Sequence, residues 1–281
     1  MTRNYYYLVA GLPDLFLDQD KKDFSYLRLK EEVMENVHPA DYEQVELLHL
    51  PYDNENFLNS LFKRNLSFTP LGKYPKELFD ELDESITLLP AYMQEFYKDY
   101  TGKGKDDEEE LPASLDEPNL NPEVKFNNLF YSYVLKRGNK FIADWYSFLR
   151  DYQNILSALS ARKLGVDIAG QLVGDSPMVE ALTRSQAPDF GLKREVEYID
   201  KLLQITEASS LLEREKHLDV FKWDIADDLA AWDYFNINKV MSFLIKANII
   251  NRWSKLDPAV GEQLFQKLVT DLQSSYQVSN K

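Results

Sequence analysis

The chain has 281 residues, of which 44% are hydrophobic and 13% aromatic, and this is enough to bury one large core or two smaller ones. The composition excludes a chain that is disordered throughout, and the absence of cysteine excludes disulfides, thiolate nucleophiles and cysteine-ligated zinc. The 32 basic and 47 acidic residues give a net charge of −15, which repels phosphate backbones and anionic headgroups, so we expect no nucleic-acid partner and no direct insertion into a bilayer.

The first elements are short. Residues 5–17 are apolar and aromatic with a glycine and a proline in the middle, and this pattern is compatible both with a buried strand and with the start of a helix. A helical period follows over 24–38. We predict two further helices over 40–50 and 55–63, because Pro51 should stop the first of them.

Capping side chains and prolines predict where the next helices begin. Asp53 or Asn54 offers a side-chain oxygen to cap the helix over 55–63. Pro75 and Pro90 each suit the first position of a helix, so two more short helices should complete an N-terminal helical lobe over residues 1–100.

Residues 101–122 interrupt the helical pattern. They contain two glycines, three prolines and an acidic run over 106–110, which indicates a linker or long loop, with an acidic docking tail as the alternative. We expect central and C-terminal helical lobes over 123–281.

The segment 124–164 is predicted to be a helical hairpin at the centre of the fold. The turn at 136–139 separates two amphipathic stretches, and Gly165 can end the second helix in a left-handed conformation. Large apolar side chains at spacings of three and four form the stripe of this second helix: Phe141, Trp145, Phe148, Tyr152, Ile155 and Leu159.

Five more helices are predicted after the hairpin. Ser176 caps a helix that begins with Pro177, and amphipathic helices follow over 192–208, 210–232, 240–253 and 257–272. Leu211 and Trp232 belong to the predicted apolar seam of the helix over 210–232. The whole chain therefore reads as an all-α bundle of helices with short connections.

No motif for catalysis or metal binding is found in the sequence. The G-x-S-x-G turn of serine hydrolases and the His-Glu-x-x-His pair of zinc enzymes are both missing, and there are only three histidines. The acids Asp224, Asp227, Asp228 and Asp233 would lie on more than one face of a helix, which favours a solvated surface. We expect a protein that is not an enzyme and has no cofactor, metal or catalytic residue.

Two segments resemble the central-stalk socket protein of V-type and A-type rotary ATPases, which is designated C in that family and d in the eukaryotic enzymes. The stretch 151–165 resembles a helix of that family that ends in an Arg-Ala-Lys-rich turn, with Asn154, Arg162 and Lys163 at matching positions. The stretch 240–253 resembles a later helix, where Lys246 and Arg252 match but an expected acid is replaced. The chain also looks like an uncharacterised bacterial family often encoded beside V-type ATPase subunits.

The resemblance implies a function without catalysis. The resembled socket protein is all-helical and funnel-shaped, consists of related lobes, and couples the central shaft of the motor to the membrane rotor ring during proton or other ion transport. The expected partners are therefore the central-shaft protein and the ring, and the expected location is the cytoplasm, peripheral to the inner face of the cell membrane through those partners. The alternative is a freestanding helical scaffold for protein interactions.

Overall fold

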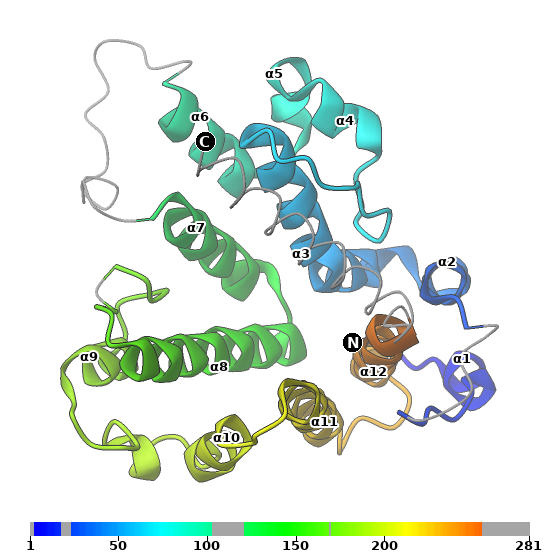
Figure 1. Cartoon of the computed structure of the whole chain (residues 1–281). Helices are drawn as coiled ribbons and strands as arrows, with labels where there is room; N and C mark the ends of the chain where they lie inside the picture. Colours follow the sequence, from blue (N-terminus) through cyan, green and yellow to red (C-terminus); the bar gives the residue numbers. More distant parts are fainter. Residues whose placement is uncertain (1–2, 18–23, 103–120, 169, 255–281) are drawn as a thin grey trace, which may run out of the picture. The chain divides into compact units, whose positions relative to one another are not determined.

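The computed structural model describes residues 3–17, 24–102, 121–168 and 170–254. Within these ranges the chain forms helices and no strand, which confirms the predicted all-α fold (Figure 1). The α-helices are α1 (Tyr6–Gly11), α2 (Tyr26–Asn36), α3 (Tyr42–Leu61), α4 (Lys76–Asp80), α5 (Leu82–Ser85), α6 (Ala91–Thr101), α7 (Pro122–Arg137), α8 (Lys140–Leu164), α9 (Pro177–Arg184), α10 (Ile199–Thr206), α11 (Leu211–Leu229) and α12 (Ile237–Ser254). Three short 3₁₀ helices are η1 (Pro39–Asp41), η2 (Ile86–Leu88) and η3 (Leu192–Arg194).

The helices belong to two compact units. The first unit combines residues 1–36 with 233–281, and in it α12 contacts α2. The second unit spans 37–232 and contains α3 to α11. The division into an N-terminal lobe over 1–100 and further lobes over 123–281 remains a prediction. Most of the predicted linker, at 103–120, and the predicted helix over 257–272 lie outside the described residues.

The predicted central hairpin is confirmed as α7 and α8, which contact each other and are drawn in green in Figure 1. The Asn139 side chain caps α8 by accepting a hydrogen bond from the Ile142 amide at 3.0 Å. Gly165 ends α8 with a φ of +67°, in the left-handed region that favours glycine. The predicted stripe of α8 is buried along most of its length, from Phe141 to Ile155, while Leu159 is half-buried.

Aromatic side chains connect the helices of the second unit. Phe57 on α3 stacks on Phe126 of α7 with ring centroids 5.4 Å apart, and Phe96 of α6 meets Phe126 edge-on at 5.2 Å. Phe148 on α8 meets Phe221 of α11 edge-on at 5.6 Å. These contacts explain why aromatic residues at helical spacing form the core here.

The predicted break at Pro51 is wrong, because α3 continues through it from Tyr42 to Leu61. A proline inside a helix has no N–H for the carbonyl four residues earlier, which here belongs to Leu47. The buried Tyr146 hydroxyl of α8 donates to this Leu47 carbonyl at 2.8 Å, and it lies 3.3 Å from the Leu48 carbonyl. A tertiary contact thus replaces the missing helical hydrogen bond, and the sequence around Pro51 does not reveal it.

The predicted capping role of Asp53 and Asn54 is also wrong, since both lie buried inside α3. The Asp53 carboxylate accepts hydrogen bonds from the amides of Lys73, at 2.9 Å, and Tyr74, at 3.1 Å. A side chain at Gly72 would place its Cβ 2.0 Å from Asp53 Oδ1, so this close approach requires glycine. Asp53 therefore attaches the segment before α4 to the middle of α3.

Of the two alternatives for residues 5–17, the structure has the helix, as the short α1 (Tyr6–Gly11), which has no buried residue. Two other predicted elements differ from the structure. The predicted helix over 192–208 is interrupted between η3 and α10, where the Tyr198 ring packs against Phe148 and Phe221 with centroids 5.6 and 5.5 Å away. Leu211 and Trp232 are 65% and 87% exposed, because α11 begins at Leu211 and ends before Trp232.

Candidate functional site

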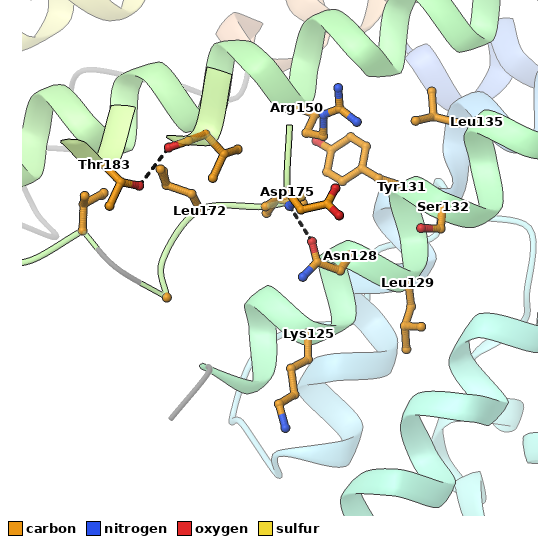
Figure 2. Close-up of a pocket in the computed structure, with 15 residues that line it drawn as sticks. Lys125, Asn128, Leu129, Tyr131, Ser132, Leu135, Arg150, Leu172, Asp175 and Thr183 are labelled. Atoms are coloured by element: carbon orange, nitrogen blue, oxygen red, sulfur yellow. Dashed lines mark hydrogen bonds between the residues drawn. The ribbon is translucent and has the colours of Figure 1, made fainter. Parts of the chain in front are cut away.

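A cavity of about 590 Å³ lies between α7, α8, α9 and the segment that joins α8 to α9 (Figure 2). Its lining is about half polar. The polar or charged residues are Lys125, Asn128, Tyr131, Ser132, Arg150, Asp175 and Thr183, and the others are Leu129, Leu135, Ile168, Gly170, Leu172, Val173, Gly174 and Val179.

Asn154 of α8 holds one wall of this cavity. Its side-chain nitrogen donates to the Val173 carbonyl at 2.8 Å, and its oxygen accepts from the Val173 amide at 2.9 Å. Asn154 is 2% exposed, so both hydrogen bonds are shielded from water. From α7, the Asn128 oxygen accepts from the Gly174 amide at 2.7 Å, as the dashed line in Figure 2 shows. The α8–α9 segment is therefore attached to both helices of the hairpin.

Arg150 supplies a cation at the cavity. Its Nε donates to Asp151 Oδ1 at 3.0 Å, and its side chain is 23% exposed. Within the described residues its two terminal nitrogens have no hydrogen-bond partner. The δ-carbon of Arg150 lies 3.9 Å from the place where a Cβ on Gly174 would sit, so this residue passes directly under the α8–α9 segment. A half-buried guanidinium with free N–H groups is suited to binding an anion.

Tyr131 lies beside Arg150 and is 6% exposed. Its hydroxyl donates to Gln153 Oε1 at 3.1 Å. Burial raises the pKa of the Tyr131 hydroxyl far above its ordinary value, and the nearby Arg150 charge opposes that change. Tyr131 is therefore a neutral hydrogen-bonding group at the cavity over the whole physiological range.

Arg162, a second position of the family resemblance, holds the segment after α9. Its terminal nitrogens donate to the carbonyls of Ser185 at 2.8 Å and Ala187 at 2.7 Å, and one lies 3.3 Å from the Pro188 carbonyl. The guanidinium carbon lies 3.7 Å from the centroid of the Phe190 ring. Asn154 and Arg162 thus connect α8 to backbone segments that follow it in the chain.

The three remaining positions of the resemblance are two lysines and an arginine. Lys163 is exposed in the last turn of α8, in the second unit. Lys246 is half-buried and Arg252 is exposed on α12, in the first unit. The cavity lining includes none of the five positions, although Asn154 holds its wall.

Sequence reasoning missed a second asparagine with the same role as Asn154. The Asn56 side chain of α3 donates to the Thr69 carbonyl and accepts from the Thr69 amide, both at 2.9 Å. The surrounding sequences correspond at a spacing of 98 residues. Identical residues occur at Asp53 and Asp151, Asn56 and Asn154, Leu58 and Leu156, Leu61 and Leu159, Arg64 and Arg162, and Leu66 and Leu164.

This repeat is a structural unit as well as a sequence similarity. In both places a long helix carries the asparagine, a segment without helix returns to it, and a short helix begins after a proline, Pro75 before α4 and Pro177 in α9. A comparison of the sequence with itself at an offset of 98 would have revealed it. The segments α3–α4 and α8–α9 therefore repeat one arrangement within the second unit.

Other chemistry is sparse in the described part of the chain. No described group of three or more His, Asp or Glu side chains is arranged to hold a metal ion. Among the helices that the structure describes, none combines the length and the apolar character needed to cross a bilayer.

Comparisons with known proteins identify a family and no function. A family model described as a protein of unknown function (DUF2764) matches residues 1–276. Searches of curated proteins and of solved structures found no match. The family match spans residues of both compact units.

Proposed function

The chain belongs to the DUF2764 family, and we propose that it is a non-catalytic central-stalk socket of a V/A-type rotary ATPase, equivalent to the socket protein that it resembles. In this role it joins the central shaft to the membrane rotor ring during ion transport. It would lie in the cytoplasm, peripheral to the inner face of the cell membrane through these partners.

The repeated helical unit is the observation that carries the proposal. The resembled socket is built from related helical lobes, and here α3–α4 and α8–α9 repeat one arrangement, with Asn56 and Asn154 making equivalent hydrogen bonds. A pattern of asparagine, two apolar residues and asparagine occurs over 56–59 and again over 248–251 in α12. The repeat supports the proposal, because the resembled socket is also built from related helical units.

Two of the five positions of the resemblance add a second line of support. Asn154 and Arg162 hold backbone segments in place, as expected of residues that a lobe retains for its architecture. Exposed apolar residues provide surface for protein partners, and Trp232, with 87% of its side chain exposed, is the largest of them in the described part of the second unit.

Native purification tests the proposal. The tagged protein is extracted from membranes with mild detergent, and mass spectrometry identifies what is bound. We expect shaft and ring proteins of a rotary ATPase in near-stoichiometric amounts. Trp232→Ser should reduce this co-purification, whereas Leu88→Ser, at a residue 64% exposed on η2, is the control. A protein that is recovered alone from the soluble fraction would contradict the proposal.

The freestanding scaffold is the second candidate, and the exposure of Trp232, Leu211 and Leu212 is compatible with it. The same purification separates the two functions. Recovery of a stable partner unrelated to ion pumping, with no ATPase protein, would favour the scaffold.

A further inference from the structure

We propose that the cavity between α7, α8 and α9 binds a small organic oxyanion, a carboxylate or a phosphate, with an apolar body. This inference is independent of the proposed function, because it rests on the chemistry of the cavity alone. No residue of the family resemblance lines the cavity, so the two ideas can fail separately.

The charged head of the ligand is assigned to Arg150. A guanidinium presents parallel N–H groups that match the two oxygens of a carboxylate or phosphate. Arg150 uses its Nε for Asp151 and keeps both terminal nitrogens without a partner among the described residues. Its side chain is more than three-quarters buried, so water screens the charge less than at an open surface.

Further donors surround the same space. Asn128 uses its oxygen for the Gly174 amide, which leaves its side-chain nitrogen as a donor with no partner in the described part of the chain. Lys125, one turn earlier on α7, is a second cation of the lining, and its amine points away from Arg150 and Asn128 in Figure 2. Asp175 is the one acid in the described lining against the two cations Lys125 and Arg150, and Asp151, which pairs with Arg150 Nε, lies outside the lining.

The apolar part of the lining indicates an organic ligand. Leucine, isoleucine and valine side chains from α7, the α8–α9 segment and α9 form much of the wall. A cavity of about 590 Å³ lies within the usual range of small-molecule sites. A free inorganic ion would use the donors and leave the apolar wall in contact with water.

Four probes test the two parts of the proposal on the full chain by calorimetry at low salt. Phenylacetate and phenyl phosphate share a ring and carry the two anionic heads, 2-phenylethanol carries a neutral head, and inorganic phosphate has no apolar body. We expect both anionic ring compounds to bind at millimolar concentrations or better, and the tighter of them identifies the preferred head. If 2-phenylethanol binds as tightly as the anionic ring compounds, the ligand does not need a negative charge, and that part of the proposal is overturned. If inorganic phosphate binds as tightly as they do, the ligand does not need an apolar body, and that part is overturned.

Substitutions locate the site. Arg150→Gln should weaken phenylacetate or phenyl phosphate binding on the order of tenfold. Arg150→Lys should weaken binding less, because lysine keeps the positive charge although it loses the paired N–H groups of the guanidinium. Asp175→Asn should tighten binding by about twofold to fivefold, since it removes a nearby like charge. Lys125→Gln should weaken binding, whereas Lys136→Gln, at an exposed lysine of α7 outside the lining, is the matched control.

The fold of each variant is checked by its urea midpoint, so that a loss of binding is separated from a loss of structure. Lys125→Gln and Asp175→Asn change partly or fully exposed side chains, and they test the site even if Arg150→Gln unfolds the protein. The proposal is overturned if no anionic probe binds, or if Lys125→Gln and Asp175→Asn leave the affinity of the folded protein unchanged.

Discussion

Replacing Tyr146 by phenylalanine removes the hydroxyl that completes α3 around Pro51. The ring and its edge-on contact with Phe130, at a centroid distance of 5.4 Å, are retained. The Leu47 carbonyl, however, loses its 2.8 Å hydrogen bond and stays buried without a donor. A buried acceptor left unpaired costs about 1–3 kcal/mol, so we expect the free energy of unfolding to fall by that amount.

Urea unfolding of a double-mutant cycle tests this reasoning. Pro51→Ala restores an N–H that can donate to Leu47 inside the helix, so Tyr146→Phe should cost less in that background, with a coupling energy of about 1 kcal/mol or more. Tyr131→Phe is the control. The Tyr131 hydroxyl donates a hydrogen bond to the exposed side chain of Gln153, so its removal leaves no buried acceptor unpaired. An equal cost of Tyr146→Phe in both backgrounds would refute the assigned role of the hydroxyl.

Three further predictions concern stability. Asn154→Ala should lower the free energy of unfolding by about 2–4 kcal/mol, because it leaves the Val173 amide and carbonyl unpaired, and a urea-measured loss below about 1 kcal/mol would contradict this. Asn59→Leu should be neutral or stabilising by the same assay, since Asn59 Nδ2 is buried without a partner in the described structure, whereas Asn56→Leu should destabilise. Burial, and then the charge of Asp53, raises the pKa of Tyr74 to about 12. The folded protein therefore holds this proton more tightly than the unfolded chain, and the resulting stability is complete below about pH 10 and lost as the pH rises towards 12. Urea midpoints across that range, compared with those of Tyr74→Phe, measure the effect, and identical pH profiles would count against it.

Local patterns predict the helices that carry their own signals. The hairpin of α7 and α8 has a turn at 136–139, a left-handed glycine at Gly165 and a regular apolar stripe, and all three are visible without knowledge of the fold. The cap at Ser176 and the extent of α12 follow in the same way.

Long-range contacts account for the features that the sequence does not predict. Pro51 interrupts the local pattern, and the donor that allows α3 to continue comes from Tyr146, on another helix. Asp53 looks like a cap because its carboxylate can serve a nearby amide, but the amides that it meets follow 20 and 21 residues later. The cavity has the same origin, because Arg150, Asn128 and Asp175 come from three separate segments.

The hydrogen bonds that Asn154 and Arg162 of α8 make to later backbone segments also limit where residues can be inserted into the chain. Asn154 holds Val173 and Arg162 holds Ser185, so α9 lies between two anchored points. An inserted residue between these points would have to move an anchor or distort α9. Insertions directly after α8 are different, because Val166 and Asp167 are exposed and the closing entropy of a loop grows slowly with its length. Variation in length among relatives should therefore concentrate between Gly165 and Asp167, and a tag or a reporter peptide is best inserted there.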